Sequence, residues 1–367
     1  MTSRATAMLP SELLDIIFSL FYHDICAGKR NTFMPVLYVN KQWHAVAERR
    51  MYASLEATNM RLINILLVCA TLENPNIAAL VKEVHLEVEL NDDSDGRYDA
   101  RLLQRCPLAS VVRLQLQIRL YSAWASLGRF KSSLAQRPWL TDLAIVGLAC
   151  TVSEVLSMLK HWPKLEKLVM QYLTADTAPT AIPTHETFAP NCCPSLRIVD
   201  IKTCLCLSDR DLQTLATLAP AVHDFSAVFV DSSRYITSAG LCVALCLWAP
   251  RLQSLFLQLD ALSIENVYPA LSHLTALRTS SDLISVQLLS NTGYGTRIAR
   301  LHYTVTSPHE LEQFATYLRN VKFMPALRVL TVDSCEVPRR DSLSSHVTIA
   351  RIAAERGIDL TVVASWS

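Results

Sequence analysis

One short motif recurs six times in this chain and limits its fold more than any other feature. The motif is Pro-x-apolar-x-x-apolar-x-apolar, as in Pro163-Lys-Leu165 followed by Leu168 and Met170. The copies begin at Pro138, Pro163, Pro194, Pro220, Pro250 and Pro325. Alternating apolar residues after a proline turn predict a short strand with one buried face. Six copies indicate a repeated structural unit.

Each repeated strand is followed by a segment that reads as a helix. Thr151-x-x-Glu154, Ser208-x-x-Asp211 and Ser307-Pro308-x-Glu310 resemble helix caps before apolar runs. From Pro138 to Pro250 successive prolines lie about 25 to 31 residues apart, near the period of leucine-rich repeats. Stacked strand–helix units share one continuous core. An ordinary α/β domain is the alternative, but it does not predict the same motif six times.

Weaker copies of the motif extend the predicted array in both directions. They are Val84/Leu86, Leu114/Leu116, Leu277, Leu301/Tyr303 and a last strand at 358–363 after Gly357, with 174–191 as an inserted surface loop. In a stacked array the middle apolar residue of each motif occupies an equivalent inward position. We therefore expect Leu143, Leu168, Val199, Leu255 and Leu330 to be buried side by side on parallel strands.

The N-terminal part has a different pattern, with apolar residues three and four positions apart. It contains Leu9-Pro10-Ser-Glu12-Leu13-Leu14-Asp-Ile-Ile17-Phe18 and then Val39-Asn-Lys41-Gln-Trp43-His-Ala-Val46-Ala47 and Tyr52. Over residues 8–55 these two segments resemble the F-box family. The polar connection from Phe21 to Phe33 is longer than the turn typical of that family. The predicted fold is α/β: a small N-terminal helical F-box-like module (1–55), a connecting helix and linker (56–78), and a leucine-rich-repeat-like solenoid with a curved parallel sheet (79–367).

The resemblance implies a function in ubiquitin transfer. The N-terminal segment is similar to that of the substrate-recognition subunits of SCF-type (Skp-cullin-F-box) E3 ubiquitin ligases. These subunits bind a Skp-type adaptor and, through it, a cullin scaffold. The residues that would contact the adaptor or support the contact are Leu9, Pro10, Leu13, Ile17, Phe18, Val39 and Trp43. Their alternative role is only to pack the module's helices together.

The residues themselves also favour a partner for this module. Ser11, Asp15 and Ser19 form one narrow polar stripe on the predicted first helix, and the rest of its circumference is mostly apolar. A module of roughly 45 residues is near the lower size limit for a self-sufficient core. Such a helix is therefore expected to face a second surface.

If the array forms, its exposed face carries the residues between the inward apolar ones. These are His85, Glu87, Arg113, Gln115, Lys167, Asp200, Lys202, Asp224, Ser254, Phe256, Arg300 and His302. The predicted binding residues for an unknown protein substrate are Lys167, Lys202, Phe256, Arg300 and His302, with Phe256 an aromatic side chain among small polar neighbours. Any one of them can instead be a merely solvated side chain.

Other classes of function lack a sequence signature. Lys and Arg number 34 and Asp and Glu 33, with no long block of one sign, so nucleic acid is not expected as a partner. No Walker loop, nucleophile elbow or His-Glu-x-x-His helix occurs, and we expect no enzymatic activity and no cofactor. A hydrolase or transferase without a recognisable motif, or a repeat scaffold without a ligase role, stays open as an alternative.

Metal sites and membrane spans are likewise not expected. His85, Glu87 and Glu89 alternate on a predicted strand, but solvated strand residues explain that pattern better than a metal site does. Cysteines such as Cys192, Cys193, Cys204, Cys206, Cys242 and Cys246 lack paired zinc spacing and are interpreted as small core residues. No apolar stretch has the roughly 20 residues of a membrane helix, and the start lacks a signal peptide pattern. The expected compartment is cytoplasmic or nuclear.

Overall fold

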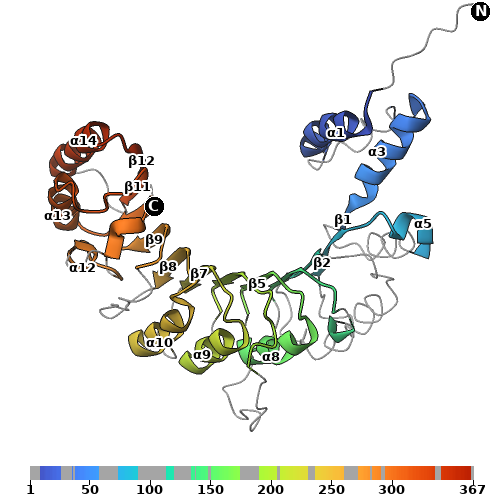
Figure 1. Cartoon of the computed structure of the whole chain (residues 1–367), viewed down its shortest axis with the longest axis horizontal. Helices are drawn as coiled ribbons and strands as arrows, with labels where there is room; N and C mark the ends of the chain where they lie inside the picture. The colour runs from blue at the N-terminus through green and yellow to red at the C-terminus, as the bar shows by residue number, and fades with distance from the viewer. Residues whose placement is uncertain are drawn as a thin grey trace, which may run out of the picture. The chain divides into compact units, whose positions relative to one another are not determined.

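A computed structural model gives the fold of the chain (Figure 1). It describes residues 9–25, 35, 38–57, 73–89, 113–119, 134–136, 138–147, 150–173, 190–204, 207–229, 236–259, 272–281, 283–290, 294–334 and 340–364. The chain divides into two compact units. The first spans Met1–Glu89 and Arg97–Leu116, and the second contains Leu90–Gly96 and Gln117–Ser367.

The first unit combines helices with the first strands. Its elements are α1 (Ser11–Ile25), α3 (Lys41–Ala53), β1 (Ser54–Ala57), α5 (Pro75–Ala78), β2 (Glu83–Glu89) and the start of β3 (Arg113–Arg119). β1 and β2 pair in parallel. β2 and β3 were predicted, but β1 was not, because four residues directly after a helix carry too short an alternation. The predicted module 1–55 lies within this unit, and the helix predicted from Asn59 lies outside the described residues.

The two long helices of the first unit have a core of their own. Leu14 and Phe18 of α1 pack against Val46 and Ala47 of α3, and all four are buried. Leu14 and Phe18 lie on one face of α1 because residues four apart are neighbours on a helix. Asn40 caps α3, since its side-chain oxygen accepts the backbone N–H of Trp43 at 2.9 Å. The predicted pair of N-terminal helices is thus confirmed.

The second unit contains nine described strands and the helices that follow them. The strands are β4 (Asp142–Val146), β5 (Lys167–Gln171), β6 (Ile198–Lys202), β7 (Asp224–Phe229), β8 (Ser254–Leu259), β9 (Ala276–Ser280), β10 (Arg300–Val305), β11 (Val329–Ser334) and β12 (Asp359–Ala364). The helical segments are α8 (Val152–Met158), η2 (Leu159–His161), α9 (Asp209–Leu218), α10 (Ser238–Trp248), α12 (Val286–Ser290), η3 (Tyr294–Arg297), α13 (Pro308–Arg319) and α14 (Arg340–Glu355).

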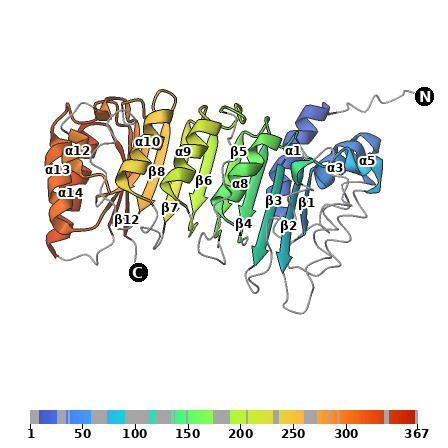
Figure 2. The same cartoon turned by 90° about the horizontal axis from the view of Figure 1, so that it is seen from below.

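These elements form two layers in a solenoid-like α/β arrangement. Strand order follows chain order, and every neighbouring pair from β4 to β12 is parallel. Figure 2 shows the strands side by side, and within the second unit Figure 1 shows them on the inner side of an arc with the helices outside. Neighbouring strands can run parallel because each connecting helix returns the chain to the end of the sheet where the strands begin.

The register of the sheet confirms the predicted inward positions. Leu143 lies opposite Leu168, which lies opposite Val199, and the same row continues through Phe225 to Leu255. It reaches Leu330 on β11 through β9 and β10. Leu143, Leu168, Val199, Leu255 and Leu330 are each at most 1% exposed. The repeated motif therefore marks one continuous buried row beneath the helices.

Two of the three predicted helix caps are reciprocal, and the third is not. Thr151 and Glu154 form a complete capping box at α8, and Ser208 and Asp211 form one at α9. At α13 the Ser307 side chain accepts the N–H of Glu310. The Glu310 carboxylate instead accepts the hydroxyls of Ser281 at 2.6 Å and Thr306 at 3.0 Å. It thereby ties α13 to the end of β9.

Acidic side chains at the start of α9 also bind the neighbouring helices. Asp211 accepts the hydroxyl of Ser153 in α8. Asp209 accepts the backbone N–H of Thr237 at 2.8 Å and its hydroxyl at 2.6 Å. Thr237 is itself the cap of α10. Gly240, in the first turn of α10, lies so close that a Cβ there would overlap the Asp209 side chain. Glycine is therefore needed for this helix contact.

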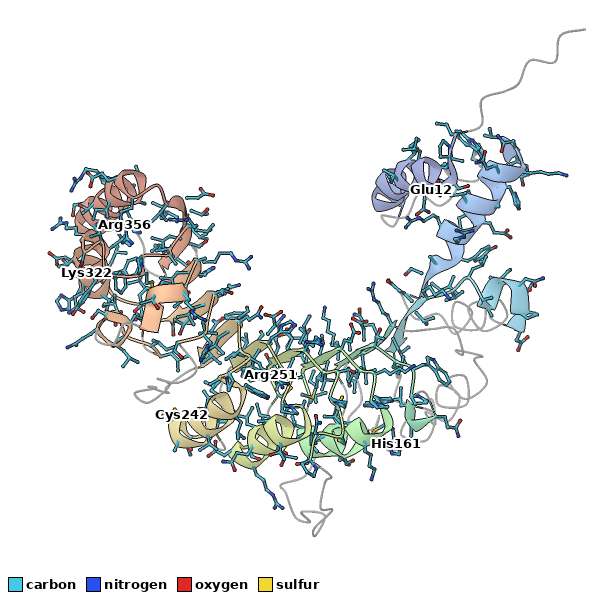
Figure 3. All side chains as sticks on the ribbon, viewed as in Figure 1. Glu12, His161, Cys242, Arg251, Lys322 and Arg356 are labelled. Atoms are coloured by element: carbon cyan, nitrogen blue, oxygen red, sulfur yellow. The ribbon has the colours of Figure 1, made fainter. Side chains whose placement is uncertain are left out.

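The opposite helix ends are joined by side-chain donors. Trp162 Nε1 donates to the Leu134 carbonyl at 3.0 Å, and Trp248 Nε1 donates to the Ala219 carbonyl at 2.9 Å. Each indole is thus bonded to the repeat that precedes it in the chain. Arg356, labelled in Figure 3, follows α14 and donates to the carbonyls of Leu318, Phe323 and Met324 at 2.9 to 3.0 Å. The Ala219 and Leu318 carbonyls lie at helix ends, where the last carbonyls have no partner within the helix.

The cysteines follow the predicted core role with one clear exception. Cys150, Cys193, Cys204 and Cys242 are buried, and burial raises the pKa of the Cys193 thiol to about 12. Cys246 is exposed, so its predicted core role is wrong. It lies on the outer face of α10, a helix so rich in apolar residues that its sequence does not reveal which side is covered. Among the described helices, none is both long and apolar enough to cross a membrane.

Candidate functional site

The first candidate surface is an apolar patch on the first unit. It consists of Leu9, Leu13, Ile16, Tyr38 and Val39, which are 42%, 46%, 56%, 79% and 56% exposed. Leu13 and Ile16 lie three residues apart and therefore on one side of α1. The Gln42 amide donates to the Leu9 carbonyl at 2.6 Å, which places the start of α3 beside the residues that precede α1. We call these five residues the N-terminal apolar patch.

The predicted adaptor contacts separate into two groups. Leu9, Pro10, Leu13 and Val39 are exposed, whereas Ile17 and Trp43 pack against the helix core and Phe18 is only 2% exposed. The rings of Phe18 and Trp43 meet edge to face with centroids 5.5 Å apart. Phe18 can therefore act only as a support for a contact surface, not as part of it.

An ion pair fixes the two helices under this patch. Arg50 of α3 binds both carboxylate oxygens of Asp15 on α1, one of them at 2.6 Å from Nε. Asp15 belongs to the predicted polar stripe of α1, so part of that stripe faces α3. Because this side of α1 is occupied by α3, the exposed Leu13 and Ile16 lie on the side that has room for a partner.

The second candidate surface is the outward face of the sheet in the second unit, where Figure 3 shows strand side chains pointing to the inside of the arc. A central row of paired residues crosses it on β5 to β11: Val169, Asp200, Ser226, Phe256, Arg278, His302 and Thr331. Lys167, Asp224, Ser254 and Arg300 lie in a parallel row nearer the strand starts. None of these residues is buried, as alternation along the strands predicts.

Phe256, Arg278 and His302 form the centre of this face. They are direct neighbours on β8, β9 and β10. The Arg278 guanidinium lies over the Phe256 ring, with its central carbon 4.2 Å from the ring centroid. This cation–π contact fixes the guanidinium group beside the ring, and Arg278 stays exposed. We call Phe256, Arg278, Arg300 and His302 the basic patch.

The other predicted residues of this face are placed at its first strands. Lys202 on β6 forms an ion pair with Asp200 at 2.9 Å, so its charge is largely compensated. Lys167 on β5 is exposed and lies about three strands from Phe256. Lys167 and Lys202 are thus separated from the basic patch, whereas Phe256, Arg300 and His302 are brought together.

The environment of His302 favours its neutral form. Burial lowers its pKa below the ordinary value of 6.5, the nearby Arg278 guanidinium lowers it further, and Asp333 on β11 partly opposes both. Its Nε2 atom is buried and has no hydrogen-bond partner among the described residues. Protonation of His302 therefore costs more in the folded than in the unfolded chain.

This lowered pKa predicts a pH-dependent stability. As the pH falls below about 6.5, the unfolded chain takes up the proton before the folded chain does, so the free energy of unfolding decreases. His302→Gln removes this contribution. Urea unfolding between about pH 7 and about pH 5 is expected to give a shallower pH dependence for the variant. Identical slopes for both proteins would contradict the prediction.

Three residues of these surfaces were missed in the sequence. Arg278 was not among the predicted residues, although it directly follows the predicted inward Leu277 and so occupies an outward position. Ile16 and Tyr38 were also missed. Ile16 lies within the F-box-like segment, three residues after Leu13, and this spacing is the signal that could have identified it.

The residues of the alternative metal sites are only partly among the described ones. The side chains of His85, Glu87 and Glu89, and the whole of Cys206, lie outside the described residues. Among the described side chains, no group of three or more His, Cys, Asp or Glu is arranged to hold a metal ion.

Comparisons with known proteins assign no family to this chain. No family model matches it, and no curated protein is significantly similar to it. The resemblance to F-box proteins therefore rests on the residues of the N-terminal segment.

Proposed function

We propose that the chain is the substrate-recognition subunit of an SCF-type E3 ubiquitin ligase, with an F-box-like module in the first unit and a leucine-rich-repeat-like array after it. The observation that carries the proposal is the N-terminal apolar patch. Its residues are exposed on a helix pair that already buries Leu14, Phe18, Val46 and Ala47 in its own core. The patch therefore stays exposed after the module has buried its own core.

Single exposed apolar residues are common on protein surfaces and need no partner. The N-terminal apolar patch differs because its members come from two segments that lie side by side, joined by the bond between Gln42 and Leu9. Exposed apolar side chains gathered on neighbouring segments are typical of a protein–protein contact. A Skp-type adaptor, and through it a cullin scaffold, is the partner that the F-box-like sequence of this segment implies.

The proposed mechanism needs no catalytic side chain. The outward face of the second unit holds a protein substrate, while the adaptor and the cullin scaffold bring the ubiquitin-charged enzyme alongside. Holding two reactants together raises their effective concentration, which is the source of the rate enhancement. This role corresponds to a cytoplasmic or nuclear protein.

The test is adaptor binding by patch variants. Leu13→Asp combined with Ile16→Asp is expected to lower co-purification of a Skp-type adaptor at least tenfold, because each change puts a charge into an apolar contact. Both side chains are about half exposed, so the helix pair should stay folded. Circular dichroism checks this point.

The matched control is Val243→Asp combined with Leu247→Asp. These residues are 49% and 51% exposed on α10 of the second unit, so the chemistry of the change is the same. The control should retain adaptor binding. Equal retention by both double variants would refute the proposed adaptor surface.

A second candidate function is a binding scaffold without a ligase role. One observation favours it: Ile17, Phe18 and Trp43 of the F-box-like segment are accounted for by the module's own packing. In that case the helix pair only covers the start of the array. The same co-purification decides between the two, since a scaffold would recover neither adaptor nor cullin from any variant or from the unaltered chain.

A further inference from the structure

Basic side chains without acidic partners gather at one part of the outward face. Arg278, Arg300 and Arg328 are exposed, and within the described part of the chain none of them forms an ion pair or a side-chain hydrogen bond. The Arg328 backbone N–H donates to the Ala299 carbonyl at 2.8 Å, so Arg328 directly precedes β11, whose first residue, Val329, lies opposite Arg300. Two arginines without an ion-pair partner therefore lie on the adjacent strands β9 and β10, which are about 4.8 Å apart, and a third directly precedes β11.

On β6 and β7 the outward face carries acidic side chains as well as basic ones. Asp200 compensates Lys202 on β6, and Asp224 at the start of β7 lies 3.2 Å from the His223 ring. On β6 the charge of Lys202 is thus balanced by Asp200. At the basic patch the Asp333 carboxylate on β11 acts on His302, while Arg278, Arg300 and Arg328 have no ion-pair partner among the described residues.

The basic patch also has an apolar component. Phe256 is partly exposed and is stacked on one side by Arg278. A ligand that places a carboxylate against the guanidinium N–H groups can place an aliphatic side chain against the remaining ring surface. Planar guanidinium groups match the geometry of carboxylates, with two parallel hydrogen bonds each.

We propose that the basic patch, extended by Arg328, recognises an acidic polypeptide segment in which aspartate or glutamate residues flank an aliphatic side chain. The inference deepens the proposed function, because it names the class of substrate that the outward face would receive. Binding of the segment itself does not depend on a ligase role.

A nucleic acid is a less suitable ligand for this surface. A phosphate backbone needs cations along an extended track, whereas Asp200 and Asp224 interrupt the face on β6 and β7. The Phe256 ring is also covered on one side by Arg278, which limits base stacking. A short acidic segment needs only the three adjacent strands.

The experiment measures binding of a defined probe to the purified full chain. The probe is a fluorescein-labelled poly-glutamate peptide with one central leucine, read by fluorescence anisotropy. Arg278→Glu combined with Arg300→Glu is expected to weaken binding by tenfold or more, because hydrogen bonds to charged groups are lost and repulsion is added. Arg278→Lys, which keeps the charge but not the planar group, should give a smaller loss.

The matched control is Lys164→Glu combined with Arg210→Glu. Both residues are exposed cations outside the basic patch, so the change in net charge is the same. This variant should bind the probe like the unaltered chain. Equal weakening by both double variants would overturn the inference, since it would show only a nonspecific charge effect.

Two further probes complete the test. A poly-glutamine peptide with the same leucine should not bind, and tight binding of it would exclude carboxylate recognition. An RNA homopolymer that binds more tightly than the peptide, and loses binding in the same patch variant, would overturn the assignment to a polypeptide. Adaptor co-purification measured in parallel is expected to be unchanged, so failure of this inference is distinguishable from failure of the proposed function.

Discussion

Replacement of Trp248 by alanine is expected to lower the free energy of unfolding by about 3 to 5 kcal/mol. Trp248 is fully buried at the end of α10, and its ring lies 4.8 Å from the Phe225 ring, centroid to centroid. The change removes the largest side chain of this part of the core. It also leaves the Ala219 carbonyl without its indole donor. Urea unfolding followed by circular dichroism measures the loss.

A second variant separates packing from hydrogen bonding at this site. Trp248→Phe keeps an aromatic ring against Phe225 but cannot donate to Ala219. A buried carbonyl without its partner costs about 1 to 3 kcal/mol, so this variant should lie between the unaltered protein and the alanine variant. A phenylalanine variant as stable as the unaltered chain would show that the bond between Trp248 and Ala219 contributes nothing.

Leu255→Ala is expected to lower the free energy of unfolding by about 2 to 5 kcal/mol, because Leu255 lies in the middle of the buried row of the sheet. It is 1% exposed and paired with Phe225 on one side and Leu277 on the other. Neither neighbour can fill the space without leaving its own position. The cavity therefore remains, and with it the loss of packing.

The adjacent residue gives the control for this prediction. Phe256 points to the outward face. Phe256→Ala removes a larger side chain than Leu255→Ala does, but that side chain is partly exposed rather than buried. Its contact with Arg278 is worth roughly 0.5 to 1 kcal/mol at such a site. The smaller effect of the larger deletion would verify the alternation of faces along β8. Equal losses at the two positions would contradict it.

Most of the strand–helix order could be predicted from the sequence because burial imposes period two on each strand. Leu168 and Met170 display that period after Pro163, and the capping residues Thr151 and Ser208 mark where helices begin. Where the signal is short or uniform, prediction fails. β1 has four residues, and α10 is apolar on all sides, so its exposed Cys246 could not be distinguished from a buried one.

The candidate surfaces were less predictable than the fold. Asp15 and Phe18 each have a side chain suited to a surface contact, but the structure turns both toward α3. Which side of α1 remains free depends on how the helices pack, and a single sequence does not record that angle. Likewise, the contact of Arg278 with Phe256 depends on the register of β8 and β9, residues 22 positions apart in the chain.

The acid–hydroxyl bonds between neighbouring helices have a consequence for how such a chain can change its length in evolution. Asp211 accepts the hydroxyl of Ser153 in the helix before it, and Asp209 accepts the hydroxyl of Thr237 at the start of the helix after it, where Gly240 leaves room for the Asp209 side chain. Deleting the α9 unit would put Gly240 at the helix position of Asp211, next to Ser153, and Val152 at that of Asp209, next to Thr237, so both hydroxyls would lose their carboxylate. Duplicating it would place the Asp209 of the first copy against Ser208 and Asp211 of the second copy, and Asp211 stands at the helix position of Gly240, so no glycine makes room. Gain or loss of whole units at this point therefore requires compensating substitutions on both sides.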